Sequence, residues 1–153
     1  MSRCFPERQR EAGTIPGVLP RGGVSSAALQ SVRILFVDDD LAVRSSMQDL
    51  LKSVGVARCV ALGSLSEVQA HGDEALSTDV AILDVNLGRG KPSGLDVFHW
   101  LERAGYVGRV VFLTGHAANH PLVRQATESS RSSILEKPIG FDQLMAILSE
   151  EKA

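Results

Sequence analysis

The sequence predicts an α/β fold: a doubly wound, five-stranded parallel sheet with five helices packed on its faces. Three runs of almost continuous apolar residues, at 32–37, 79–85 and 109–113, are typical of strands covered on both sides. Between the first two runs, apolar residues recur at helical spacing from Val43 to Val54. Strands that alternate with helices in this way form parallel βαβ units with right-handed crossovers.

Local signals define the remaining elements. Gly55 ends the first helix, and a short strand follows around Val56–Ala61. Ser64 and Glu67 have the spacing of a capping box and open a second helix, which Gly72 interrupts or ends. The later elements are expected, in chain order, as a helix at Gly94–Ala104, a weaker helix at Asn119–Glu128, a strand at Ser133–Glu136 and a helix at Phe141–Glu150.

Composition limits the class of protein. With 153 residues, 44% of them hydrophobic, the chain can bury the core of one ordinary domain. A net charge of −2 gives no indication of a nucleic-acid surface. Cys4 and Cys59 lie far apart in unlike sequence, so we expect no disulfide framework and a reducing, cytoplasmic setting. Neither a signal peptide nor a run long enough to span a membrane is present.

The chain divides into three parts. Residues 1–31 are rich in Gly, Pro, Ser and Arg without periodicity, and we expect a disordered leader with no feature that indicates a docking arm. Residues 32–150 form the folded domain, and 151–153 form a tail. Because the sequence ends directly after the fifth helix, we expect a stand-alone domain without an output domain.

Polar residues follow the predicted strands at one edge of the sheet. They are Asp38, Asp39 and Asp40 after the first strand, Asp84 at the third, Thr114 after the fourth, and Lys137 with Pro138 after the fifth. In an open parallel sheet, ligands bind outside the carboxyl ends of the strands. The sequence therefore predicts a site at this edge.

These residue types suit phosphoryl transfer. Carboxylates held close together repel one another unless a cation intervenes, and Mg²⁺ prefers carboxylate, carbonyl and phosphate oxygens. With the ion present, a carboxylate can act as the nucleophile. Thr114 could donate a hydrogen bond to a phosphoryl oxygen, and Lys137 could place a positive charge on another.

The segments ILFVDDD, VAILDVNL, SGLDV, VVFLTGH and ILEKP together resemble a CheY-like response-regulator receiver of two-component signal transduction, over residues 32 to about 150. The resemblance implies a flavodoxin-like strand order of 2-1-3-4-5. It also implies that Asp84 is the phosphoacceptor and that Asp38, Asp39, Asp84 and the backbone carbonyl of Asn86 form the Mg²⁺ site. Thr114 and Lys137 are then the residues that contact the phosphoryl group, and the peptide before Pro138 is cis.

The function implied is that of a single-domain response regulator. It would accept a phosphoryl group on Asp84 from a histidine kinase or a histidine-phosphotransfer protein and signal by contact with an unknown downstream protein. It would catalyse only its own phosphorylation and dephosphorylation, as a monomer or weak homodimer in the cytoplasm, with no nucleic acid and no membrane among its partners.

The sequence departs from the family in three places, one of which is the stretch ESSRSS at 128–133, without the small-residue turn common there. The loop GRGKP is about two residues longer than in the shortest receivers and borders the site. Ile134 stands where the family usually has Tyr or Phe, so the usual switch is in question, and an interaction module with little phosphorylation-driven switching is an alternative. A more remote alternative is a haloacid-dehalogenase-type phosphatase, suggested by Asp38 and Asp40 after an apolar strand. Asp40 itself is expected to cap the first helix rather than bind metal.

Overall fold

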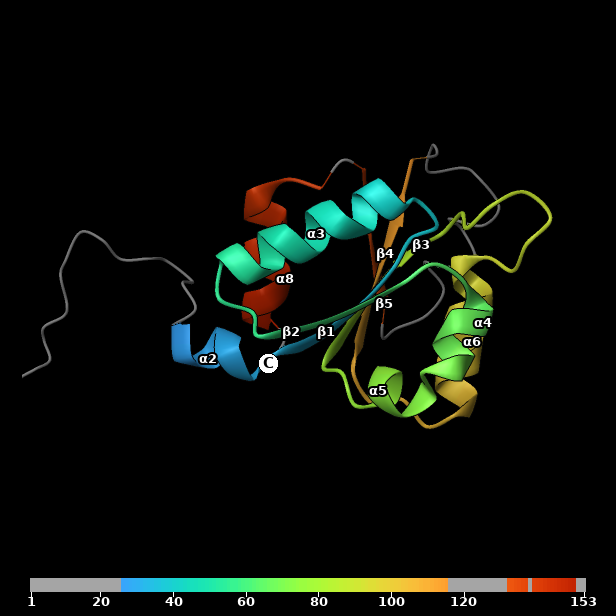
Figure 1. The fold of residues 1–153 in the computed structure, drawn as a ribbon, viewed down its shortest axis with the longest axis horizontal. Helices are drawn as coiled ribbons and strands as arrows, with labels where there is room; N and C mark the ends of the chain where they lie inside the picture. The colour runs from blue at the N-terminus through green and yellow to red at the C-terminus, as the bar shows by residue number, and fades with distance from the viewer. Residues whose placement is uncertain (1–25, 116–131, 138, 151–153) are drawn as a thin grey trace, which may run out of the picture.

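The computed structural model describes residues 26–115, 132–137 and 139–150. Its centre is one parallel sheet with strand order β2-β1-β3-β4-β5, which confirms the predicted α/β fold and strand order. The strands are β1 (Arg33–Val37), β2 (Arg58–Leu62), β3 (Val80–Asp84), β4 (Arg109–Thr114) and β5 (Ser132–Glu136). Helices lie on both faces of the sheet (Figure 1).

The described helices number six rather than five. They are α2 (Ser26–Ser31), α3 (Leu41–Ser53), α4 (Leu65–Ala70), α5 (Gly72–Leu76), α6 (Gly94–Arg103) and α8 (Phe141–Glu150). The second expected helix is split at His71 into α4 and α5, next to the glycine predicted to interrupt it. The helix expected at Asn119–Glu128 lies outside the described residues.

Helix α2 differs from the expectation of a leader without structure up to residue 31. Leu29 in this helix is only 3% exposed and packs against Gly55, at the end of the first βα unit. Residues 26–31 are therefore part of the folded domain, while residues 1–25 lie outside the described part of the chain.

Each face of the sheet has its own core because successive residues of a strand point to opposite sides. Ile34 and Phe36 of β1 join the core beneath α3 and α8, whereas Leu35 and Val37 join the core beneath α4, α5 and α6. Figure 1 shows α3 and α8 on one side of the strands and α4, α5 and α6 on the other. Both faces of β1 and β3 are buried, as the continuous apolar runs predicted. Among the described residues, no helix has the length and apolar character needed to span a bilayer.

Candidate functional site at the carboxyl edge of the sheet

The parallel strands bring the predicted site residues to one edge of the sheet. Asp38 directly follows β1, Asp84 ends β3 and Thr114 ends β4. Asp84 lies opposite Leu113 in the register, so Asp84 and Thr114 are one step apart along neighbouring strands. Lys137 follows β5, and its backbone N–H donates to the Thr114 carbonyl at 2.8 Å. Four of the five strands thus deliver a polar residue to the same edge.

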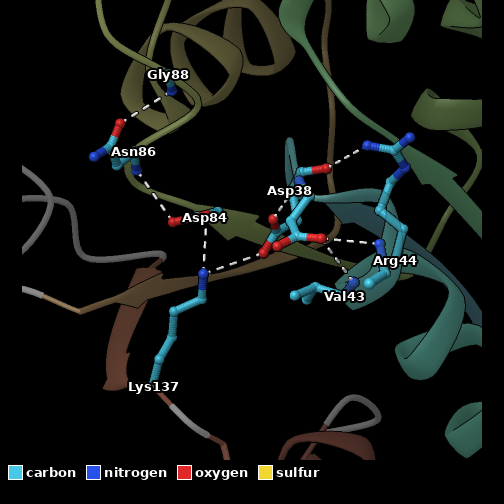
Figure 2. Close-up of polar contacts among 9 residues, drawn as sticks. Asp38, Val43, Arg44, Asp84, Asn86, Gly88 and Lys137 are labelled. Carbon is cyan, nitrogen blue, oxygen red and sulfur yellow. Dashed lines mark hydrogen bonds and ion pairs between the residues drawn. The ribbon is translucent and has the colours of Figure 1, made fainter.

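Lys137 joins two buried carboxylates. Its Nζ donates to Asp84 Oδ2 at 3.0 Å and to Asp38 Oδ2 at 3.2 Å, as Figure 2 shows. Asp38 is 1% exposed and Asp84 is 5% exposed. Burial alone would lower the pKa of Lys137, but the hydrogen bond and charge of Asp84, with those of Asp38, raise it above its ordinary value. Lys137 is therefore held as a cation between the two acids.

Asp84 is a carboxylate whose surroundings favour neutralisation of its charge. Burial raises the pKa of the Asp84 carboxyl and the charge of Asp38 adds to this, although Lys137 and the backbone N–H of Asn86 act in the opposite direction. Only one of its oxygens is engaged by Lys137; the other accepts from the Asn86 N–H at 3.1 Å. A further cation at this carboxylate would relieve the penalty of burial.

The acidic cluster has the composition of a site for a hard divalent cation. Carboxylate oxygens of Asp38, Asp39 and Asp84 lie within 4.8 Å of one another. An all-oxygen set that is open to a cleft suits Mg²⁺, which keeps waters and phosphate oxygens in its shell rather than filling it with protein ligands. The predicted residues therefore fit the ion. The contribution expected of the Asn86 carbonyl stays a prediction.

Asp40 belongs to the first helix rather than to the acidic cluster. Its side chain accepts from the backbone N–H groups of Ala42 and Val43 at the start of α3, as predicted for a cap. Its own N–H donates to Asp38 Oδ1 at 2.9 Å. Asp40 thus orients the buried acid through the backbone while its own carboxylate stabilises the helix end.

The loop after β3 forms one wall of a cleft over the acids. The Asn86 side-chain oxygen accepts from the Gly88 N–H at 3.0 Å, and Gly88 adopts a φ of +119° that favours glycine (Figure 2). The cleft has a volume of about 520 Å³ and is lined by Asp39, Asp84, Asn86, Gly88, Arg89, Gly115 and Lys137. The longer loop noted in the sequence therefore borders the site and brings Arg89 to it.

Thr114 is buried at the end of β4, 2% exposed, and its predicted contact with a phosphoryl group stays a prediction. Pro138 lies outside the described residues, and so does the expected cis peptide. Ile134 is half-buried in β5 and packs against the core beneath α4, α5 and α6. Trp100 is partly exposed.

Sequence reasoning missed two residues that shape the site. The Arg44 guanidinium donates to the Asp38 carbonyl at 2.8 Å. Only the fold reveals this contact, because Arg44 lies six positions further along the chain, beyond the helix cap. Gly94 lies directly against the backbone of Asp84 and Val85, so that no side chain fits there. The one sequence signal for Gly94 is its place immediately after the Ser93 cap of α6, where a glycine is otherwise unhelpful to a helix.

Comparisons with known proteins agree with this fold. A family model for the response regulator receiver domain matches residues 34–149. The chain is 31% identical over 127 residues to nodulation protein W of Bradyrhizobium diazoefficiens, across 82% of this chain and 52% of that protein. It is 26% identical over 137 residues to the response regulator protein TodT of Pseudomonas putida, across 87% and 57%. The chain spans about half the length of these curated relatives.

Solved structures share the fold. A CheY-like receiver domain from Methylobacillus flagellatus superposes with a TM-score of 0.62 at 24% identity, covering 79% of this chain and 99% of that one. The receiver domain of the histidine kinase CKI1 from Arabidopsis thaliana, in complex with Mg²⁺ and BeF₃⁻, has a TM-score of 0.62 at 17% identity, covering 82% and 93%. The family match extends over most of the chain, and the chain therefore belongs to the response regulator receiver domain family.

Proposed function

We propose that this receiver accepts a phosphoryl group on Asp84 in a Mg²⁺-dependent reaction, with a phosphohistidine of a histidine kinase or a histidine-phosphotransfer protein as donor. The observation that carries the proposal is the arrangement of Asp84, a buried carboxylate that faces a cleft beside two further acids and a lysine. Membership of the receiver family supports it. The setting proposed for this exchange is the cytoplasm.

The chemistry is a displacement at phosphorus. A carboxylate oxygen of Asp84 attacks the phosphorus atom, the P–N bond to the donor histidine breaks with its electron pair staying on the imidazole, and an acyl phosphate forms on Asp84. Bound Mg²⁺ would neutralise charge on the transferred oxygens. Lys137 would exchange its bond to Asp84 for one to a phosphoryl oxygen, and Thr114 would donate to another. The protein thereby catalyses its own modification and not the turnover of a substrate.

The donor needs a surface beside the cleft. An apolar cavity of about 610 Å³ adjoins it, lined by Phe36, Ala42, Val43, Ser46, Met47, Leu50, Leu113, Lys137 and Ile139. Lys137 lines both the cleft and this cavity. A partner that buries an apolar helix face against α3 would hold its phosphohistidine next to Asp84, which agrees with a protein donor.

The test is covalent labelling. The protein is incubated with acetyl phosphate and Mg²⁺, and its intact mass is measured in parallel with Asp84→Asn. We expect one added phosphoryl group on the wild type, none on the variant and none when a chelator removes the metal. Wild-type protein that gains no adduct from acetyl phosphate or from a phosphohistidine donor would refute the proposal.

A second candidate function is a receiver-fold interaction module that binds its partner with little change on phosphorylation. Ile134 favours it because this aliphatic side chain already packs against the core in place of the usual aromatic. Partner binding that is equally tight with and without the Asp84 adduct would support this candidate. Membership of the receiver family gives no support to the phosphatase alternative.

A further inference from the structure

The peptide that links Asp38 to Asp39 is held by a side chain from α3. Arg44 Nη1 donates to the carbonyl oxygen of Asp38 at 2.8 Å (Figure 2). This carbonyl belongs to a residue that is 1% exposed, just past the last residue of β1. The Asp38 N–H still bonds to the Leu62 carbonyl of the neighbouring strand, at 3.0 Å. The sheet therefore bonds the N–H of Asp38, and Arg44 bonds the carbonyl of the same residue.

Asp39 depends on this peptide for its direction. No hydrogen bond or ion pair joins the Asp39 side chain to any residue in the described part of the chain, although its oxygen lies within the acidic cluster. Because a peptide unit is planar, rotation of the Asp38 carbonyl also rotates the Asp39 N–Cα bond. The donor on the Asp38 oxygen therefore controls where the Asp39 carboxylate points.

The Arg44 guanidinium is itself confined. A Cβ placed on Gly63 would lie 2.6 Å from Arg44 Nη1 and 3.2 Å from its Cζ, so the guanidinium occupies the space a side chain at position 63 would need. Glu67 fixes Gly63 in turn, accepting from its N–H at 2.7 Å. At its other end, Arg44 is anchored in the first turn of α3 by its N–H bond to the Asp40 carbonyl, at 3.0 Å.

We propose that Arg44 is a positioning residue for the divalent-cation site: through the Asp38 carbonyl it orients the Asp38–Asp39 pair, and the absence of a side chain at Gly63 is what admits it. The inference rests on the proposed function, because the cation is the one proposed to assist phosphorylation of Asp84. What it states, however, is an effect of Arg44 on the binding of the cation. A simple charge effect has the opposite sign, since a cation near the acids opposes the approach of Mg²⁺ and its removal would tighten binding.

Two variants separate position from charge. Arg44→Met removes both the hydrogen bond and the charge. Gly63→Ala keeps the charge but displaces the guanidinium, and because its φ is not positive and the obstructing atoms are the end of a flexible side chain, the fold can accommodate it. Lys52→Met is the matched control, since it removes one cation from the same helix near its last turn.

Binding of Mg²⁺ is measured directly by isothermal titration calorimetry, and melting temperature is followed with and without the metal. We expect Arg44→Met to weaken Mg²⁺ binding by about tenfold, the scale of groups that orient metal ligands. Gly63→Ala is expected to weaken it in the same direction, Arg44→Lys by less, and Lys52→Met not at all. When Arg44→Met is labelled with acetyl phosphate, the Mg²⁺ concentration that gives half the maximal rate should rise, while the rate at saturating Mg²⁺ is largely retained.

Unchanged or tighter Mg²⁺ binding in Arg44→Met, or unchanged binding in Gly63→Ala, would overturn the inference. Circular dichroism and melting without Mg²⁺ show whether each variant folds, and if Arg44→Met does not, Gly63→Ala decides. If the wild type binds Mg²⁺ but never acquires an Asp84 adduct, the proposed function fails while weakened binding in the variants still upholds Arg44.

Discussion

Gly94→Ala is expected to displace the proposed phosphoacceptor by steric contact alone. A Cβ on Gly94 would lie 2.9 Å from the Asp84 carbonyl carbon, 3.0 Å from Val85 Cα and closer still to the Asp84 carbonyl oxygen. Ordinary contact begins at 3.4 Å, so the backbone at the end of β3 would have to move by about 1 Å to clear the nearest atom.

The loss of folding free energy in Gly94→Ala follows from the rigidity of the backbone that must move. The obstructing atoms are backbone atoms of Asp84, the last residue of a fully buried central strand, and of Val85 directly after it, and they cannot rotate away as a flexible side chain could. Overpacking of this kind costs about 1–3 kcal/mol. At about 4 °C per kcal/mol for a domain of this size, the melting temperature should fall by roughly 4–12 °C. Because reacting groups tolerate little misplacement, labelling of Asp84 by acetyl phosphate should slow by about tenfold or more.

The assay pairs a thermal melt with time-resolved intact mass. Gly140→Ala is the matched control, since its nearest new neighbour is Gln143 Oε1 at an ordinary 3.7 Å and its φ is not positive. Gly140→Ala should melt and label like the wild type. If Gly94→Ala also melts and labels like the wild type, the argument from close backbone approach is refuted.

Two further perturbations test the electrostatics. Lys137→Met leaves two buried carboxylates without their shared cation, so the melting temperature should fall in the absence of metal and recover with Mg²⁺. A fall of the same size at saturating Mg²⁺ would contradict this expectation. Burial raises the pKa of the Cys59 thiol to about 11. In a Cys4→Ser background, alkylation of Cys59 at pH 8 should therefore be about 100-fold slower than in the unfolded chain, and fast reaction at that pH would contradict the burial. The thiol loses its proton near pH 9 in the unfolded chain but only near pH 11 in the folded chain. The Cys59 thiol should therefore make the free energy of unfolding decrease as pH rises from 9 to 11. Urea titrations at several pH values measure this decrease.

The central strands could be predicted from sequence because burial on both faces leaves a continuous apolar run. β1, β3 and β4 lie where those runs placed them. β2, at the edge of the sheet, is less buried than the central strands, and its apolar pattern is correspondingly weaker. Its predicted bounds, Val56–Ala61, therefore differ by one or two residues from the observed Arg58–Leu62.

Helix α2 could not be predicted because its sequence has no apolar pattern. It is six residues long, which is less than two helical turns and too short for a recurring apolar stripe. A single leucine in a segment rich in small and polar residues has no periodicity to detect. Its burial depends on the space above Gly55, which exists only once the first βα unit has folded.

The candidate site was more predictable in its members than in its contacts. A parallel sheet gathers whatever follows its strands, so Asp38, Asp84, Thr114 and Lys137 could be assigned to one edge without knowing any distance. That Lys137 bridges two carboxylates depends on side-chain conformation, which strand order does not specify.

Backbone placement, and not the number of acids, sets the geometry of this site. The side chain of Asp39 is not held by hydrogen bonds within the described residues, and its direction follows from the peptide that Arg44 holds. The backbone of Asp84 has its position because Gly94 lies against it. A chain could therefore keep every carboxylate of the motif and still lose the site by changing Arg44 or Gly94. Conversely, the two residues together give a criterion for an intact site that does not depend on the acids themselves: a donor that reaches the Asp38 carbonyl and no side chain behind Asp84.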